Sequence, residues 1–133
     1  MVTPAEITAA TREDLMSAMR GEAFAYASYM LFAEAARRNG RAEIAALFEA
    51  TARTELLEHF AQQATLVGLV GGDAENLRRA IEGESHEIEV MYPSYAEHAR
   101  AAGDAAAADR LEEIRRDELD HLEAFREALE SIG

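Results

Sequence analysis

The sequence contains no cysteine and no tryptophan, and only two prolines and few aromatic residues occur among its 133 residues. Without cysteine, a disulfide framework, a thiolate zinc site and thiol catalysis are excluded. Valine, isoleucine and threonine never alternate regularly with polar residues, so no β-strand is predicted. No apolar run approaches the roughly 20 residues that are needed to span a bilayer.

Basic residues are also scarce, because 13 lysines and arginines face 26 aspartates and glutamates and leave a formal charge of −13. A field of this sign repels phosphate backbones and anionic lipids, so we expect no nucleic-acid partner and no membrane-surface role. Residues 1–11 lack the basic and then apolar pattern of a signal peptide. A cytoplasmic protein is therefore expected.

The residues that are abundant, namely alanine, leucine, glutamate and arginine, favour helices. Thr11 begins a capping-box pattern, and Asn39-Gly40 is a typical helix end. Pro93 should kink its helix without ending it, because the apolar pattern continues at Tyr95. The sequence predicts one all-α domain over residues 1–133, a four-helix bundle with helices at about 11–39, 41–67, 74–102 and 104–131.

The second half of the chain repeats the spacing of the first half. The corresponding positions are Gly21-Glu22 and Gly83-Glu84, Gly40 and Gly103, Glu55 and Glu118, and Glu58 and His121. Each of Glu55 and Glu118 follows its glycine by fifteen residues. We therefore expect two similar helical hairpins.

Every predicted helix carries carboxylates near the middle of its apolar stripe. In chain order these are Glu22, then Glu55 with Glu58, then Glu84 with Glu87 at its edge, and then Glu118 beside His121. Buried and unpaired, each carboxylate would cost on the order of several kcal/mol, and no stripe offers an arginine at this level. Two metal cations would compensate the charge, and oxygen ligands with an imidazole suit iron or manganese. The alternative is that the glutamates are simply solvated.

At these residues the sequence resembles the di-iron domain of the rubrerythrin family over nearly the whole chain. The most specific matches are Gly83-Glu84-Ser85-His86-Glu87 followed by Met91-Tyr92-Pro93, Gly21-Glu22 followed by Tyr29, and Glu118-x-x-His121. The resemblance implies a ferritin-like bundle with two iron ions, manganese or a mixed pair being the alternatives. It implies ligands at Glu22, Glu55, Glu84, Glu87, Glu118 and His121, and hydrogen bonds to them from Tyr29 and Tyr92. It also implies reduction of hydrogen peroxide.

The chain departs from the family pattern in two places. Where the family normally has histidine the chain has Glu58, with His59 next to it. Positions i+3 and i+4 flank position i on a helix, so either residue can reach a metal beside Glu55; the internal repeat favours Glu58. The four cysteines of a rubredoxin domain are also absent, which implies a separate electron-donor protein. A ferroxidase that handles iron with oxygen, and a metal-free acidic interaction bundle, remain alternative functions.

The linker at residues 68–72 bears on assembly. In ferritin-like bundles the second and third helices run parallel, so the connection must travel the length of the bundle. Five residues reach at most about 18 Å, whereas the second helix is roughly 40 Å long. The sequence therefore predicts a homodimer that exchanges hairpins, or else a simple up-down-up-down bundle. In the dimer, each site takes Glu22, Glu55 and Glu58 from one chain and Glu84, Glu87, Glu118 and His121 from its partner.

Overall fold

The structure of the protein is a computed structural model that describes residues 6–133. The first part of segment 1–11, where no signal peptide is expected, lies outside this range. All regular secondary structure within residues 6–133 is helical, which confirms the predicted all-α fold class. No helix in the described part of the chain is long and apolar enough to cross a membrane. The helices form two compact units that divide between Val70 and Gly71, here called the first and second hairpins.

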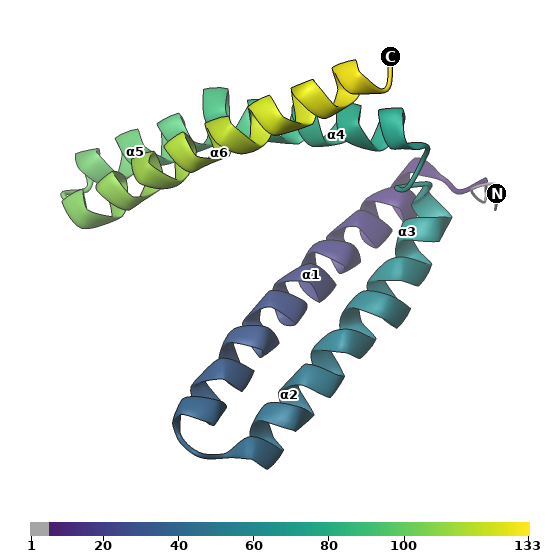
Figure 1. The fold of residues 1–133 in the computed structure, drawn as a ribbon, viewed down its shortest axis with the longest axis vertical. Coiled ribbons are helices and arrows are strands. Elements are labelled where there is room, and N and C mark those ends of the chain that lie inside the picture. The colour runs from purple at the N-terminus through teal and green to yellow at the C-terminus, as the bar shows by residue number, and fades with distance from the viewer. Residues whose placement is uncertain (1–5) are drawn as a thin grey trace. The chain divides into compact units, whose positions relative to one another are not determined.

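The first hairpin consists of two antiparallel arms (Figure 1). Its first arm is a single α-helix, and its second arm is continuous but contains a π-helical segment in the middle. The elements are α1 (Ala9–Arg38), then α2 (Ala42–Thr54), the π-helix η1 (Glu55–Phe60) and α3 (Ala61–Val67).

The second hairpin has the same plan in reverse, with the π-helical segment in its first arm. The elements are α4 (Asp73–His86), the π-helix η2 (Glu87–Met91), α5 (Tyr92–Ala101) and then α6 (Ala105–Ser131). Pro93 lies in the first turn of α5, so the helical path continues through it as expected, and the irregularity precedes it as η2. All four arms begin and end within two residues of the bounds expected from the sequence. That the two hairpins form one domain stays a prediction.

Both hairpin turns use the same glycine-dependent helix end. Gly40 and Gly103 have φ values of 70° and 83°, a left-handed conformation that costs glycine little. The Gly40 N–H donates to Arg37 O at 2.9 Å and the next N–H donates to Ala36 O at 2.9 Å; the turn at Gly103 has the same pair of bonds. This Schellman arrangement satisfies carbonyls at the helix ends, and it explains why the glycines repeat.

The start of α1 differs from the expected capping box. Thr8 is the capping residue, and its side chain accepts a hydrogen bond from the Thr11 N–H at 3.2 Å. The helix therefore begins at Ala9, two residues before the predicted start. Because Thr8 accepts the bond from the third N–H of the helix, as an N-cap residue does, Thr11 lies in the first turn and does not cap the helix.

Small side chains and a few aromatic rings hold the first hairpin together. Ala33, Ala36 and Ala45 are buried between α1 and α2, and the rings of Tyr29, Phe32 and Phe48 pack against one another. Large apolar residues of this hairpin nevertheless remain exposed, among them Met30, Leu47, Leu56 and Leu57. Two helices alone bury little apolar surface, which is why such hairpins associate into bundles.

An arginine ties the two arms together in each hairpin. Arg12 Nη1 donates to Val67 O at 2.8 Å, and Arg115 Nε donates to Ile88 O at 2.8 Å. Val67 ends α3, where free carbonyls favour a cation. Ile88 lies in η2, where the change from i+4 to i+5 hydrogen bonding disturbs the regular ladder.

The linker between the two hairpins is short and partly fastened. Gly68 ends α3 with φ 66°, and α4 begins at Asp73. The Gly71 N–H donates to Asn76 Oδ1 at 2.8 Å, and Asn76 Nδ2 donates back to Gly71 O at 3.0 Å. This reciprocal pair fixes the last part of the linker to the first turn of α4.

Candidate metal centre

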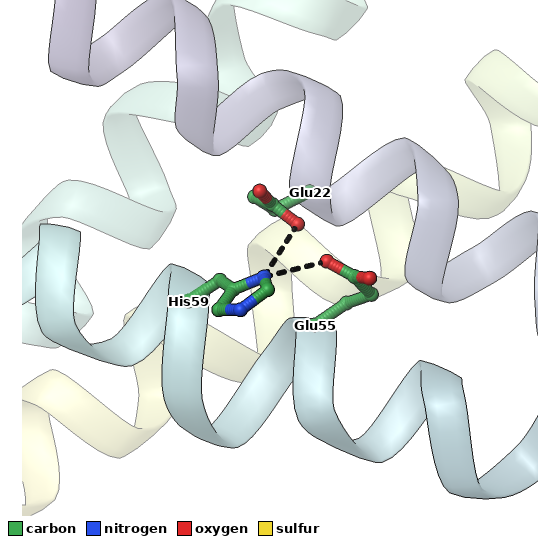
Figure 2. Close-up of side chains that lie close together, drawn as sticks. All are labelled: Glu22, Glu55 and His59. Carbon is green, nitrogen blue, oxygen red and sulfur yellow. Dashed lines mark hydrogen bonds and ion pairs between the residues drawn. The ribbon is translucent and has the colours of Figure 1, made fainter.

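The first hairpin brings two glutamates and a histidine together, called the first group (Figure 2). Glu22 comes from the middle of α1, and Glu55 and His59 come from η1 in the facing arm. The His59 Nδ1 lies 3.0 Å from Glu55 Oε2 and 3.5 Å from Glu22 Oε2. The glutamate side chains are largely buried, at 24% and 16% exposed, whereas the His59 side chain is half exposed.

The π-helical geometry of η1 explains why the histidine stands four residues after the glutamate. An α-helix turns once in about 3.6 residues, and a π-helix, bonded from i to i+5, takes more residues per turn. Within η1, position i+4 therefore comes back over position i. His59 lies over Glu55, and the two side chains point at the same place between the arms (Figure 2).

The second hairpin assembles the same three residue types, called the second group. Glu84 comes from α4, and Glu118 and His121 come from α6, which is regular α-helix with a three-residue spacing between them. The His121 Nδ1 lies 2.9 Å from Glu118 Oε2 and 3.9 Å from Glu84 Oε1. The exposures parallel those of the first group, because the two glutamates are 18% and 17% exposed and the histidine is 58% exposed.

Close carboxylates perturb one another in both groups. In the first group, a proton shared with Glu55 raises the pKa of Glu22, and the same interaction lowers the pKa of Glu55. In the second group, the interaction with Glu118, followed by burial, raises the pKa of Glu84 to about 7. The pKa of Glu118 is lowered, first by its hydrogen bond with Glu84 and then by His121, against the opposing effect of burial. Hydrogen bonds to Glu55 and to Glu118 raise the pKa values of the two histidines.

These features fit a metal cation. Glu84 Oε2 is buried and has no hydrogen-bond partner within the described residues, whereas buried polar atoms normally have one. Each group offers two carboxylate oxygens and one imidazole nitrogen that all lie within 4.8 Å of one another. That donor set suits iron and manganese, and a cation would replace the shared protons as the compensating charge.

The remaining predicted residues lie around the two groups. Glu58 is in η1, but its side chain is exposed, and the first group contains His59 in its place. Glu87 begins η2 and is half-buried, and its charge acts on Glu84 and on Tyr92. The internal repeat favours Glu58, whereas the four-residue spacing from Glu55 is the signal in the sequence that indicates His59.

The two predicted tyrosines have different surroundings. Burial, followed by the charges of Glu87, Glu118 and Glu84, raises the pKa of Tyr92, which is half-buried beside the second group. Tyr29 is also half-buried, and its ring packs on Phe32 and Phe48. Tyr92 therefore lies within the electrostatic influence of the candidate ligands.

Within each hairpin, two glutamates and a histidine from the two arms meet at one place. This arrangement is typical of carboxylate–histidine metal proteins of the ferritin-like class. Comparison with known proteins is more specific, because the family model described as Rubrerythrin matches residues 13–129. The chain belongs to the rubrerythrin family.

Several curated proteins of this family are similar to the chain. Nigerythrin from Nitratidesulfovibrio vulgaris is 32% identical over 92% of this chain and 67% of its own length. Rubrerythrin from Porphyromonas gingivalis is 33% identical over 84% of this chain, and symerythrin from Cyanophora paradoxa is 30% identical over 78% of it. The matched regions cover 62% and 73% of those two relatives, so the chain spans about two thirds of the length of these proteins.

Proposed function

We propose that this chain is a di-iron oxidoreductase that reduces hydrogen peroxide with electrons from a separate donor protein. The observation that carries the proposal is the paired constellation, two glutamates and a histidine in each hairpin of a chain that belongs to the rubrerythrin family. Both groups sit at mid-length of their arms, where a four-helix bundle has its most water-excluded core.

The ligands of the metal pair come from both hairpins in this proposal. The proposed positions are Glu22, Glu55, Glu84, Glu87, Glu118 and His121, together with one of the two neighbours Glu58, which the internal repeat favours, and His59, which the first group contains. Four of the seven have largely buried carboxylates, and Glu118 and His121 are already hydrogen-bonded to each other at 2.9 Å. Iron is the expected metal, and manganese or a mixed pair would be held by the same oxygen and nitrogen donors.

The chemistry divides between the metal pair and the chain. When bound, the iron pair supplies the two electrons that, with two protons, convert hydrogen peroxide into two water molecules. The chain holds the pair with flexible carboxylates, whose protons leave when metal binds. Tyr92 keeps its hydroxyl proton at neutral pH, because its surroundings raise its pKa. It can therefore donate a hydrogen bond to a ligand oxygen or to peroxide.

Metal analysis followed by oxidation kinetics tests this function. Anaerobic loading with ferrous iron should give about two iron ions per chain, as in di-iron bundles. The loaded protein should then react faster with hydrogen peroxide than with oxygen. Preference for oxygen, with continued turnover of free ferrous iron, would favour the iron-handling alternative. Fewer than one tightly bound iron per chain would contradict any di-metal function.

We also propose that the site is assembled by two chains that exchange hairpins. The second arm of the first hairpin, Ala42–Val67, is roughly 39 Å long at about 1.5 Å per residue. Residues 68–72 reach at most about 18 Å, and Asn76 holds the end of that linker. A connection along the whole bundle is therefore too long for one chain, and exchange through a short hinge is a known route to dimers.

A mixing experiment tests the exchange. A Glu55→Ala chain and a Glu118→Ala chain each carry one damaged hairpin, and neither should hold a metal pair alone. After mixing under conditions that allow exchange, a swapped heterodimer contains one site built from two intact hairpins. Metal binding should then return to about half of the wild-type value for each heterodimer. No recovery, together with a monomeric wild-type protein that binds two metals, would refute the exchange.

A further inference from the structure

The second arm of the first hairpin offers two neighbouring candidate ligands, Glu58 and His59. The internal repeat, taken without gaps, matches Glu58 to His121 and so favours the carboxylate. That match assumes that both arms carrying these residues are regular α-helices. In the structure α6 is regular from Ala105 to Ser131, but the corresponding arm of the first hairpin contains η1.

The π-helical segment changes the spacing at the position where the ligand is chosen. It begins at Glu55, and a π-helical bulge corresponds to one extra residue within an α-helix. A three-residue step from Glu118 in α6 therefore becomes a four-residue step from Glu55 in η1. Corrected for this extra residue, the repeat matches His59 to His121.

The contacts in the two hairpins agree with the corrected match. The His59 Nδ1 is 3.0 Å from Glu55 and the His121 Nδ1 is 2.9 Å from Glu118, each across the arm that carries both residues. Each Nδ1 also faces the glutamate of the opposite arm, Glu22 at 3.5 Å or Glu84 at 3.9 Å. The exposed side chain of Glu58 is outside the first group.

We infer that His59, bound through Nδ1, is the metal ligand that η1 contributes in place of Glu58. This inference rests on the proposed di-metal function. It makes the ligand sets of the two hairpins chemically equal, since each supplies two carboxylates and one imidazole. It also removes one negative charge from the ligand set that the sequence alone predicts, which makes the oxidised metal pair less favoured and the pair a stronger oxidant.

A count of coordinated histidines on the wild-type protein tests the inference directly. Loading with Co²⁺, a paramagnetic substitute for ferrous iron, shifts the ring N–H proton of each bound histidine far outside the ordinary proton NMR range. Two such exchangeable signals are expected. The His121→Gln variant should keep one signal, the His59→Gln variant should keep the other, and Glu58→Gln should keep both.

Ferrous affinity gives a second readout that does not depend on activity. His59→Gln and His121→Gln should each weaken binding by at least about tenfold, since even indirect partners of metal ligands cost about 10–100-fold. Glu58→Gln, the matched control one residue away, should bind like the wild type.

The possible outcomes distinguish a failure of the His59 assignment from a failure of the proposed di-metal function. Wild-type protein that binds two metals but shows one histidine signal, lost only in His121→Gln, overturns the inference and leaves the di-metal function standing. Loss of affinity in Glu58→Gln with normal affinity in His59→Gln does the same. A wild-type protein that binds less than one metal ion per chain would contradict the proposed di-metal function itself. Because the wild-type signal count needs no variant, poor folding of a variant does not obscure the result.

Discussion

The two hairpins reach the same arrangement of side chains by different backbone routes. In the first, Glu55 and His59 are four residues apart on a π-helical segment, and in the second, Glu118 and His121 are three residues apart on a regular α-helix. The distances from histidine to glutamate nevertheless agree within 0.1 Å, at 3.0 and 2.9 Å. The comparison shows that residue spacing is meaningful only together with the local helix type.

The largest expected effect comes from removing one carboxylate from each group. Glu55→Gln and Glu118→Gln keep side-chain size but lose charge, and each should weaken ferrous binding by about 100-fold or more, since indirect partners alone cost about 10–100-fold. Isothermal titration calorimetry under anaerobic conditions measures the ferrous affinity of each variant. Equal losses support equivalent hairpins, and a large loss in only one variant would break the comparison. Glu130→Gln, an exposed position on α6, serves as the control.

The second prediction concerns the pH dependence of stability, to which the two hairpins should contribute unequally. The folded protein raises the pKa of Glu84 to about 7 from 4.5, so between these values it binds protons more tightly than the unfolded chain does. Stability of the metal-free protein should therefore fall as pH rises from about 5 to 8. The raised histidine pKa values act in the same direction, because their contribution is present at low pH and is lost as pH rises through the folded value.

Thermal unfolding of chelator-treated protein, followed by circular dichroism, measures this pH dependence. Glu84→Gln should flatten it more than Glu22→Gln, since the pKa of Glu22 is raised too, but the second group has the larger shift. Metal loading should reverse the slope, because ligands must lose their protons to bind. A metal-free protein whose melting temperature rises steadily over this pH range would contradict the proton sharing.

A smaller effect concerns the arginines that tie the arms. Arg115→Ala removes the donor to Ile88 O in η2, and Arg12→Ala removes the donor to Val67 O. Each should lower the free energy of unfolding by about 0.5–1.5 kcal/mol, the usual net value of a hydrogen bond. Chemical denaturation measures both. Arg20→Ala, an exposed position on α1, is the control and should be near neutral.

The smallest change in metal content is expected from a deletion that makes the hairpins alike. Removing Glu58 leaves Glu55-Leu56-Leu57-His59, the Glu-x-x-His spacing of α6. If η1 is a one-residue insertion, the arm becomes regular α-helix and metal content stays near the wild-type value. Deleting Ala50 from the regular helix α2 should instead rotate the residues beyond it by about 100° and abolish binding. Loss of metal in both deletions would show that η1 is no simple insertion.

Sequence reasoning reached the fold class, the two hairpins and the positions of their turns, because helix periodicity and glycine ends are local signals. It also selected Glu22, Glu55, Glu84, Glu118 and His121, which the structure brings together in two groups. The π-helical segments could not be predicted from the sequence, since one extra residue in a helix has no characteristic composition. That single feature decides whether Glu58 or His59 faces the opposite arm.

In the proposed hairpin-exchanged dimer, the short linker ties metal retention to the association of two chains. If each site takes one hairpin from each of two chains, dilution that separates the chains also divides every site into two halves. Each half retains one group, Glu22, Glu55 and His59 or Glu84, Glu118 and His121, and therefore fewer ligands. By mass action, iron retention then grows with the concentration of the protein, and iron in turn holds the chains together. In the proposed dimer, a linker of only five residues would thus make the iron content per chain depend on how much of the chain the cell produces.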